Sequence, residues 1–328
     1  MKNNVLITGV NGQDGSYLTE LLIKKGYEVY GIIRRHSVAE HQTFRLDDLE
    51  EFNISNNLEY GDLTDFSSLQ RLINKIKPCM IFNLGAQSHV RVSFDAPIYT
   101  TDTIIGGTLN LLECIRLSNH PIKFYQASSS EMFGNNIDND GFQRETTPMT
   151  PVSPYGAAKL CAFHNVQIYR KSYNLFACNG ILFNHESPFR GVNFVTNKIV
   201  RGAVMINKGI TNELLLGNLD ASRDWGHAKD YVNAMLKIME LDKPDDFVCS
   251  TGETHTVQDL CDYVFNKLDL SKKLIKIDER FKRPNELNIL KGDSSKLKKA
   301  TNWKPKYTFH SMIDEMIEYW DSKLEVHK

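Results

Sequence analysis

Residues 5–26, VLITGVNGQDGSYLTELLIKKG, place an apolar run, a glycine-rich turn and a helix-like segment in direct succession. The apolar run ends at Gly9, and residues 16–26 show helical spacing that ends at another glycine. This order is typical of the first strand-to-helix turn of a dinucleotide-binding sheet, although a tight turn without a ligand is the alternative. Glycine lets backbone amides approach a pyrophosphate, whose charge is favoured at a helix N-terminus. The turn therefore predicts cofactor contacts at Gly9, Gly12, Gln13, Asp14 and Gly15.

The alternation of strands and helices continues through the first half of the chain. Apolar runs predict strands at 27–33, 57–61, 80–85, 122–128 and 175–183, and helical spacing predicts helices at 65–77, 96–118 and 155–174. Such alternation implies a parallel, doubly wound, Rossmann-like sheet of the α/β class. Within 96–118, Gly106 and Gly107 would each cost a helix roughly 1 kcal/mol, so we expect them to permit close packing.

After residue 184 the alternation of strands and helices becomes less regular. Loops rich in Asn, Pro, Gly and Arg separate shorter elements, and a last helix is expected at 309–323. We expect residues 1–183 to form a Rossmann domain that binds the cofactor, completed by part of 218–250. Residues 184–328 are expected to form mainly a smaller, mixed α/β substrate domain.

The composition of the chain argues against several classes of protein. A formal net charge of −1 over 328 residues gives no reason to expect nucleic acid or an anionic membrane surface as a partner. No apolar run approaches the ~20 residues that span a bilayer, and the N-terminus lacks signal-peptide architecture. Six cysteines without a C-x-x-C pair indicate small core hydrophobes in a reducing compartment. We therefore expect a cytoplasmic protein with no metal site, in which His89 and His227 are structural.

The end of the second predicted strand departs from the usual NAD pattern. An NAD site commonly carries an acidic residue about 20 residues after the glycine turn, where it binds the adenosine ribose hydroxyl. Here Arg34 and Arg35 stand instead. A guanidinium binds a 2′-phosphate in bidentate fashion, although a solvated basic pair is the alternative. The pair predicts NADP, and Asp62 after the next strand is a candidate partner for the adenine amino group.

Tyr155 and Lys159 are four residues apart in a segment with helical spacing, so they share one helix face. A tyrosine with an ordinary pKa of about 10 is a poor base at neutral pH. A nearby ammonium group and a positive nicotinamide ring would both stabilise its phenolate. A surface pair is the alternative, but the nucleotide-binding pattern favours a catalytic pair.

The segment QASSSEMFG, residues 126–134, ends the fifth predicted strand with three hydroxyls and a carboxylate. If this strand ends at the mouth of a cofactor site, Glu131 is a candidate base, with Ser129 and Ser130 beside it. A surface loop that carries a solvated carboxylate is the alternative.

Together these patterns resemble the extended short-chain dehydrogenase/reductase superfamily, and finer motifs resemble the GDP-mannose 4,6-dehydratases. These motifs are TGVNGQDGSYL, GIIRR, YGDLTD, NLGAQSHV, YQASSSEMFG, ACNGILFNHESP, RDWGHAKDYV and RPNELNILKGD, and they run from residue 8 to residue 293. Ser129 stands where the family commonly has Thr, and it keeps the hydroxyl. Phe189 stands where Arg is frequent, beside a retained Arg190. Close relatives act on a GDP-manno-heptose, so the sugar stays open between mannose, which we favour, and manno-heptose.

The resemblance implies a dehydration without net redox change. Tyr155 would take the proton from the sugar 4-hydroxyl while the C4 hydride passes to NADP. Lys159 would lower the pKa of Tyr155 and hold the nicotinamide ribose. Glu131 would then remove the acidified C5 proton, while Ser129 and Ser130 bind the sugar oxygens. Water leaves from C6, and the same hydride returns to C6.

The resemblance also implies further binding residues. Additional cofactor contacts are expected at Leu63, Leu84, Ala86, Ser88, His185 and Arg190. Contacts with the GDP-sugar are expected at Ser88, Ser129, Glu131, Asn184, Asn193, Lys198, Arg223, Arg283 and Glu286. In the family, the segment after the arginine pair (36–42 here) reaches a neighbouring subunit beside the cofactor, which implies a homotetramer.

Three other functions use the same fold. A nucleotide-sugar 4-epimerase shares the Tyr and the Lys but needs no base at C5, so Glu131 argues against it. A ketoreductase would release oxidised cofactor stoichiometrically, which the absorbance of reduced nicotinamide would detect. A non-catalytic NADP-binding regulator is disfavoured because Tyr155, Lys159 and Glu131 are retained together.

Overall fold

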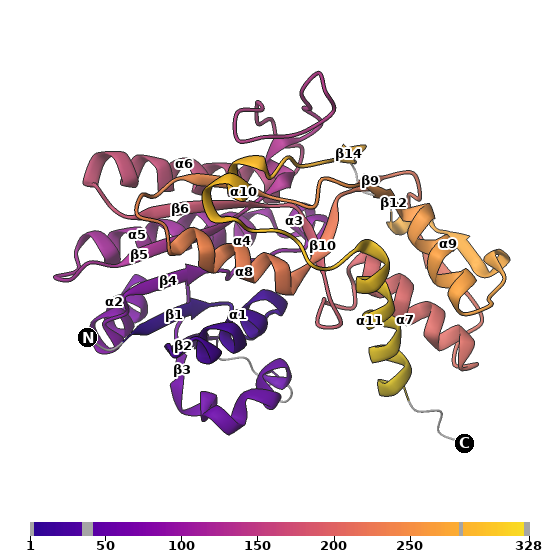
Figure 1. Cartoon of the computed structure of the whole chain (residues 1–328), viewed down its shortest axis with the longest axis horizontal. Helices are drawn as coiled ribbons and strands as arrows, with labels where there is room; N and C mark the ends of the chain where they lie inside the picture. Colours follow the sequence, from indigo (N-terminus) through magenta and orange to yellow (C-terminus); the bar gives the residue numbers. More distant parts are fainter. Residues whose placement is uncertain (1–2, 35–41, 282–284, 325–328) are drawn as a thin grey trace.

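A seven-stranded parallel sheet forms the centre of the computed structural model, which describes residues 3–34, 42–281 and 285–324 (Figure 1). Its strand order is β11-β6-β5-β4-β1-β2-β3, and every pairing is parallel. The strands are β1 (Asn4–Thr8), β2 (Glu28–Ile33), β3 (Leu58–Tyr60), β4 (Met80–Asn83), β5 (Lys123–Ser129), β6 (Ala177–Leu182) and β11 (Asp246–Cys249). The first strand lies inside the sheet and the winding reverses beside it, which confirms the predicted doubly wound, Rossmann-like architecture.

Helices cover both faces of this sheet (Figure 1). One face carries α1 (Gln13–Lys24) and α8 (Ala228–Met239), and the other carries α2 (Phe66–Ile76), α5 (Gly107–Arg116) and α6 (Pro154–Tyr173). β1 contributes to both layers, since Val5 and Ile7 pack with α1 and α8 whereas Leu6 packs with α2 and α5. A strand buried on both faces reads as a continuous apolar run, which is why the first strand was detectable in the sequence.

The helix predicted over 96–118 is interrupted. α4 (Pro97–Thr101) runs into a π-helical turn, η3 (Asp102–Gly106), before α5 begins. A Cβ at Gly107 would lie 2.7 Å from the Cβ of Leu63, so this glycine does permit close packing. A Cβ at Gly106 would meet no atom within 4 Å, so the same expectation is wrong there. The short helix α3 (Val90–Asp95), which precedes this segment, was not predicted.

The second half of the chain adds a smaller lobe with its own apolar core, at the right of Figure 1. Its core is built on α7 (Val195–Asn207), α9 (Val257–Lys267) and α11 (Phe309–Lys323), the last of which has the predicted bounds. The remaining elements of the second half are β7 (Asn184–Glu186), β8 (Leu214–Leu216), β9 (Ser222–Arg223), β10 (Trp225–His227), β12 (His255–Thr256), β13 (Ile275–Ile277), β14 (Ile289–Leu290), α10 (Ser295–Thr301), η5 (Lys272–Leu274) and η6 (Glu279–Phe281). The short 3-10 helices η1 (Phe44–Phe52), η2 (Ile54–Asn57) and η4 (Ser130–Phe133) belong to the first half.

The chain returns from the smaller lobe to the central sheet. α8 packs on α1, and β11 pairs with β6 so that Val248 lies opposite Ile181. The returning segment falls within 218–250, the range named above. The domain boundary between residues 183 and 184 stays a prediction.

The motif RDWGHAKDYV ties these segments together through buried polar groups. Asp224 accepts hydrogen bonds from the backbone amides of Thr251 (2.9 Å) and Gly252 (2.8 Å), and burial raises the pKa of Asp224 to about 6. His227 caps α8 through its Nδ1 atom, and its Nε2 atom lies 2.8 Å from a carboxylate oxygen of Glu315 on α11. These contacts give His227 a structural role.

The described ranges test some of the expectations from composition. All six cysteines are free thiols, of which four are buried and Cys79 is half-buried. Cys161 is exposed on α6, so its expected place in the core is wrong. Across those ranges no helix is long and apolar enough to cross a bilayer, and no three His, Cys, Asp or Glu side chains are arranged to hold a metal ion.

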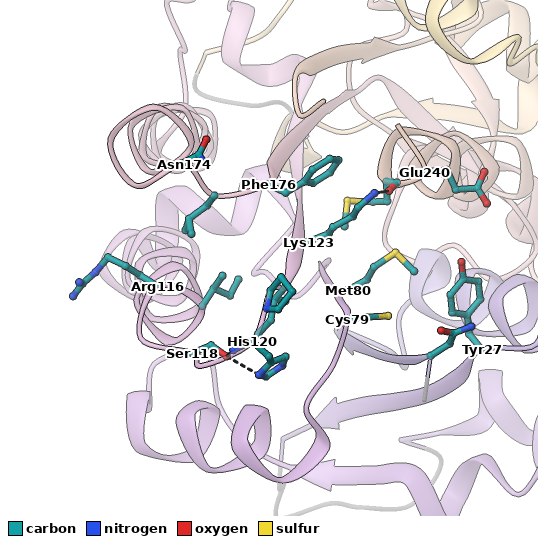
Figure 2. A pocket seen from close by; sticks show the side chains of 16 residues that line it. Tyr27, Cys79, Met80, Arg116, Ser118, His120, Lys123, Asn174, Phe176 and Glu240 are labelled. Carbon is teal, nitrogen blue, oxygen red and sulfur yellow. Dashed lines mark hydrogen bonds between the residues drawn. The ribbon is translucent and has the colours of Figure 1, made fainter. Parts of the chain in front are cut away.

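A cavity of about 710 Å³ lies at the amino edge of the sheet (Figure 2). Its walls include Tyr27, Cys79 and Phe176, each of which immediately precedes a strand. The ammonium of Lys123 lies 4.2 Å from the centroid of the Phe176 ring and donates to the carbonyl oxygen of Met239 at the end of α8 (2.8 Å). The predicted cofactor and catalytic residues follow the carboxyl ends of the strands, so this cavity is separate from the candidate active site.

Candidate active site

The glycine turn between β1 and α1 is closely packed. Gly9 has φ +70°, and a Cβ on it would lie 2.9 Å from the backbone nitrogen of Gly85. A Cβ on Gly15 would lie 2.3 Å from the carbonyl oxygen of Gly9. The N-cap residue of α1 is Gly12, which has no side chain to cap the first turn. The turn therefore presents helix-terminal amides without a bulky side chain, which fits the pyrophosphate of a dinucleotide cofactor.

The predicted adenosine-side residues follow β2 and β3 along the same edge. Arg34 donates to the phenol oxygen of Tyr99 on α4, and its guanidinium carbon lies 5.8 Å from the centroid of that ring. Asp62 accepts hydrogen bonds through Oδ1 from both the amide (2.9 Å) and the hydroxyl (2.8 Å) of Thr64. Arg35 lies outside the described residues, as does most of the segment 36–42.

The loop after β4 borders the glycine turn. The hydroxyl of Thr8 at the end of β1 donates to Oδ1 of Asn83 (2.6 Å) and accepts from the amide of Gly85 (3.0 Å). These bonds join the ends of β1 and β4. The predicted cofactor residues Leu84, Ala86 and Ser88 lie on this loop, with Ser88 exposed, and Leu63 is buried nearby against Gly85 and Gly107.

The three serines at the end of β5 do not point to one place. The hydroxyl of Ser128, which was not among the predicted site residues, donates to Oδ1 of Asn179 on β6 (3.1 Å). The hydroxyl of Ser129 instead accepts from the amide of Glu131 (3.2 Å) and begins the 3-10 helix η4. Ser130 and Glu131 are both buried, with exposed fractions of 2% and 7%. Glu131 is therefore not a solvated carboxylate on a surface loop.

Tyr155 and Lys159 lie on the first turns of α6, which begins with Ser153 as N-cap and Pro154 as first residue. The ammonium of Lys159 donates to the carbonyl oxygen of Ala127 on β5 (2.7 Å) and lies 5.7 Å from the centroid of the Tyr155 ring. This bond holds α6 against the strand that delivers Ser129 and Glu131. The hydroxyl of Ser129 is hydrogen-bonded to Tyr155, and the charge of Glu131 acts on the same tyrosine. Four of the five predicted catalytic residues are therefore neighbours, and the fifth, Ser130, is buried next to them in the chain.

Burial shapes the electrostatics of this pair. It raises the pKa of Tyr155 to about 12, although a hydrogen bond with Ser129 acts in the lowering direction. Burial also lowers the pKa of Lys159 to about 8, against the opposing charge of Asp14. Tyr155 is therefore protonated at neutral pH in the cofactor-free protein. Added positive charge, such as that of an oxidised nicotinamide ring, is required before it can act as a base.

A polar network joins the first turn of α1 to β7. Nε2 of His185 lies 2.8 Å from Oδ2 of Asp14, and Nδ1 of His185 lies 2.7 Å from the carbonyl oxygen of Phe183. Gln13 donates to the carbonyl oxygen of His185 (3.1 Å) and accepts from the hydroxyl of Ser187 (2.7 Å). Sequence reasoning named Gln13, Asp14 and His185 separately but missed Ser187, whose only signal was its place in the motif ACNGILFNHESP.

The loop that follows β7 carries Arg190. Its Nε atom lies 3.1 Å from a carboxylate oxygen of Glu186, and its guanidinium carbon lies 3.7 Å above the ring of Phe194. The ring of Phe189, the position that departs from the resembled pattern, stacks on Tyr17 of α1 with centroids 5.1 Å apart. Phe189 is therefore part of the packing between this loop and α1.

The predicted substrate residues of the smaller lobe fall on several elements. Arg223 on β9 forms an ion pair with Glu286 (3.0 Å). Lys198 on α7 lies with its ammonium 3.1 Å from the centroid of Phe281, a contact that sequence reasoning missed. Asn193 is exposed, Arg283 lies outside the described residues, and Oδ1 of Asn184 is buried without a hydrogen-bond partner among the described residues. An unpartnered buried acceptor beside the catalytic edge fits a ligand contact.

Comparisons with known proteins show which family the chain resembles over nearly its whole length. Residues 6–316 match the family model described as GDP-mannose 4,6 dehydratase. The chain is 49% identical over 331 residues to GDP-mannose 4,6 dehydratase 1 of Arabidopsis thaliana, covering 98% of this chain and 90% of the relative. It is 47% identical over 341 residues to the GDP-mannose 4,6 dehydratase of Homo sapiens, covering 96% and 91%.

Two solved structures share the fold at lower identity. The dTDP-glucose 4,6-dehydratase of Bacillus anthracis in complex with NAD has a TM-score of 0.82 at 23% identity, covering 97% of this chain and 96% of that one. The UDP-glucose 4-epimerase of Thermotoga maritima with UDP-glucose has a TM-score of 0.85 at 24% identity, covering 98% and 100%. Because dehydratases and epimerases fit equally well, these two likenesses support the fold and not the reaction.

Proposed function

Since the chain belongs to the GDP-mannose 4,6-dehydratase family, we propose that it converts GDP-mannose to GDP-4-keto-6-deoxymannose with NADP as its resident cofactor. It is a nucleotide-sugar 4,6-dehydratase that works with a nicotinamide cofactor. The observation that carries the proposal is the contact between Lys159 of α6 and the end of β5, which places Tyr155 in hydrogen-bond contact with Ser129 and within the influence of the charge of Glu131.

Each catalytic group has a step that its position supports. Bound nicotinamide supplies a reversible hydride acceptor, so the reaction needs no external oxidant or reductant. Tyr155 accepts the proton of the sugar 4-hydroxyl, and Lys159 holds positive charge beside the phenol ring at 5.7 Å. Ser129, whose hydroxyl bonds to Tyr155, orients the 4-oxygen.

Glu131 is the base for the second stage. A ketone at C4 acidifies the C5 proton, and an enclosed carboxylate can remove it without competition from bulk water. The hydroxyl at C6 then leaves as water with the proton that Glu131 took from C5. Return of the hydride to C6 and of a proton from solvent to C5 would complete the 4-keto-6-deoxy sugar with no net redox change. Arg190 on the neighbouring loop would contact the cofactor, since a guanidinium donates to phosphate oxygens. The unpartnered Oδ1 of Asn184 would accept a hydrogen bond from a hydroxyl of the sugar.

The substrate is tested by incubating the protein with a panel of GDP-sugars and weighing the products. We expect GDP-mannose to lose one water and UDP- and dTDP-sugars to remain unchanged. GDP-manno-heptose is the second candidate substrate, and the comparison of turnover on the two sugars decides between them. Phe189 stands where Arg is frequent in the family, and its ring packs on Tyr17 of α1. This packing supports the view that the difference from the family does not reshape the sugar site. Dehydration of UDP- or dTDP-sugars without any turnover of GDP-sugars would contradict the proposal.

NADP is preferred over NAD in this proposal because Arg34 stands where NAD-binding proteins commonly have an acidic residue. An acidic residue would repel the 2′-phosphate of NADP, whereas a guanidinium binds it. Arg34→Ala should weaken NADP binding by roughly 10- to 100-fold, the worth of one or two hydrogen bonds to a charged group, and leave NAD binding nearly unchanged. Isothermal titration with both cofactors measures this difference. Arg116→Ala, at the opposite edge of the sheet beside the amino-edge cavity, is the matched control. Equal weakening of NADP and NAD would mean that Arg34 does not read the phosphate.

We also propose that the protein is a homotetramer with the cofactor near a subunit interface. The resemblance of the segment 36–42 to the family's intersubunit loop supports this arrangement. Light scattering at micromolar concentration should give four times the 37.5 kDa mass of the chain. A monomer at that concentration would rule the arrangement out.

The proposed compartment is the cytoplasm. Six free thiols suit a reducing environment, where disulfides do not persist. Fractionation of cells that express the natural gene should recover the protein with cytoplasmic markers, and recovery with secreted or membrane fractions would contradict this placement.

A further inference from the structure

Both ring nitrogens of His185 face oxygen acceptors. Nδ1 lies 2.7 Å from the carbonyl oxygen of Phe183, and a carbonyl can only accept. Nε2 lies 2.8 Å from Oδ2 of Asp14. A neutral imidazole carries one N–H, which the carbonyl of Phe183 uses. One more proton must therefore lie between Nε2 and the carboxylate, either on the ring or on Asp14.

The surroundings place that proton on the ring. Burial by itself lowers the pKa of His185, but the charge and hydrogen bond of Asp14 raise it above its ordinary value. Burial raises the pKa of Asp14, but His185 and the charge of Arg190 bring it below its ordinary value. The ring of Tyr231 stacks on the imidazole with centroids 4.5 Å apart, a contact that favours a cation.

We propose that Asp14 is a positioning residue whose carboxylate keeps His185 as a doubly protonated imidazolium between the glycine turn and β7. This role rests on the proposed function, because it matters to catalysis only where the site holds a nicotinamide cofactor. It differs from direct cofactor binding, since both oxygens of Asp14 are engaged inside the protein: Oδ2 with His185, and Oδ1 as acceptor from the side-chain Nε2 of Gln13 (3.2 Å).

The pair fixes the position of β7 relative to α1. Gln13 continues the contact through the carbonyl of His185 and the hydroxyl of Ser187. The strand held in this way leads directly into the loop of Arg190. An ion pair of low solvent exposure, 10% for the His185 side chain and 21% for Asp14, is worth more than a surface pair, because water screens it less.

The charged groups around the pair link it to the catalytic lysine. Arg190, Glu186 and Tyr155 interact electrostatically with Asp14, with His185 or with both. Lys159 is buried, and the negative charge of Asp14 is what raises its pKa against that burial. Without this charge the pKa of Lys159 would fall further, so Lys159 would lose its proton at a lower pH. Asp14 and His185 carry opposite charges at every pH between the lowered pKa of Asp14 and the raised pKa of His185.

The test reads the protonation of His185 directly by long-range 1H–15N correlation spectra of the histidine rings. The full chain is recorded with and without bound NADP between pH 6.5 and 8.5, and His185→Gln identifies the signals by difference. We expect both nitrogens of His185 to be protonated at pH 6.5, and the second proton to be lost only as the pH rises through the raised pKa of His185. In Asp14→Asn the ring should become neutral with the proton on Nδ1, because the amide can donate to Nε2. A neutral His185 in the unaltered protein at pH 6.5, or an unchanged ring in Asp14→Asn, would overturn the proposal.

A second readout tests the link to catalysis. In Asp14→Asn the alkaline limb of the kcat profile should move to lower pH by on the order of one unit, while much of the rate at pH 6.5 is retained. Glu20→Gln is the matched control, since it removes one carboxylate from the exposed side of the same helix. A uniform loss of rate without a shifted limb would assign Asp14 a structural role only. The spectra need no turnover, so a failure of the proposed substrate leaves the test of Asp14 intact.

Discussion

Glu131→Gln is expected to stall the enzyme after oxidation at C4. Glutamine matches glutamate in size, and the residue is enclosed with 7% exposure, so substrate and cofactor should still bind. Tyr155 and Lys159 remain, so the first stage can proceed. The variant lacks the base at C5, a role that is typically worth roughly 10²- to 10⁴-fold. Dehydration should fall by that factor, with little change in the affinity for GDP-mannose.

Rapid mixing distinguishes this stall from a general loss of activity. The absorbance of reduced nicotinamide should rise when Glu131→Gln meets GDP-mannose and should then persist, while C5–H hardly exchanges with deuterated water. Glu145→Gln makes the same chemical change at a carboxylate that accepts from the amide of Val248 (2.8 Å), and it should keep most of the activity. A near wild-type rate of dehydration in Glu131→Gln would make the carboxylate structural and the mechanism wrong.

The sheet was predictable because its strands are buried on both faces. β1 and β6 read as short apolar runs between turn signals, and their observed bounds, Asn4–Thr8 and Ala177–Leu182, differ from the predictions by one to two residues at each end. The interruption at η3 was less accessible. A π-helical turn changes the hydrogen-bond register without a distinctive residue pattern, so the segment 96–118 reads as one helix.

The site was predictable where its geometry is local. Tyr155 and Lys159 lie four residues apart on one helix, and Glu131 follows a strand end directly. The Asp14–His185 pair joins residues 171 positions apart in sequence, so only the return of β7 to α1 reveals it. The different roles of Ser128 and Ser129 have a simpler reason. Successive side chains of a strand point to opposite faces, so Ser128 and Ser129 could not both face the site.

Tyr155→Phe is expected to prevent even the first stage. The hydroxyl of Tyr155 is the group at this position that can accept the proton of the sugar 4-hydroxyl. Burial raises its pKa to about 12 in the cofactor-free protein, so Lys159 and the nicotinamide charge must act together to make it a base. Removal of the hydroxyl leaves nothing for them to activate. Turnover should fall by at least roughly 10²- to 10⁴-fold, and mixing with GDP-mannose should produce no absorbance of reduced nicotinamide.

The order of the two stages gives this prediction its sharpest form. Since Glu131 acts only after Tyr155, the double variant should be no slower than Tyr155→Phe, and it should lack the persistent absorbance of Glu131→Gln. Tyr125→Phe is the matched control, because the buried hydroxyl of Tyr125 has no hydrogen-bond partner among the described residues, and its loss should cost little activity. If Tyr155→Phe instead accumulates reduced nicotinamide as Glu131→Gln does, another group takes the proton at the 4-oxygen and Tyr155 only positions the sugar.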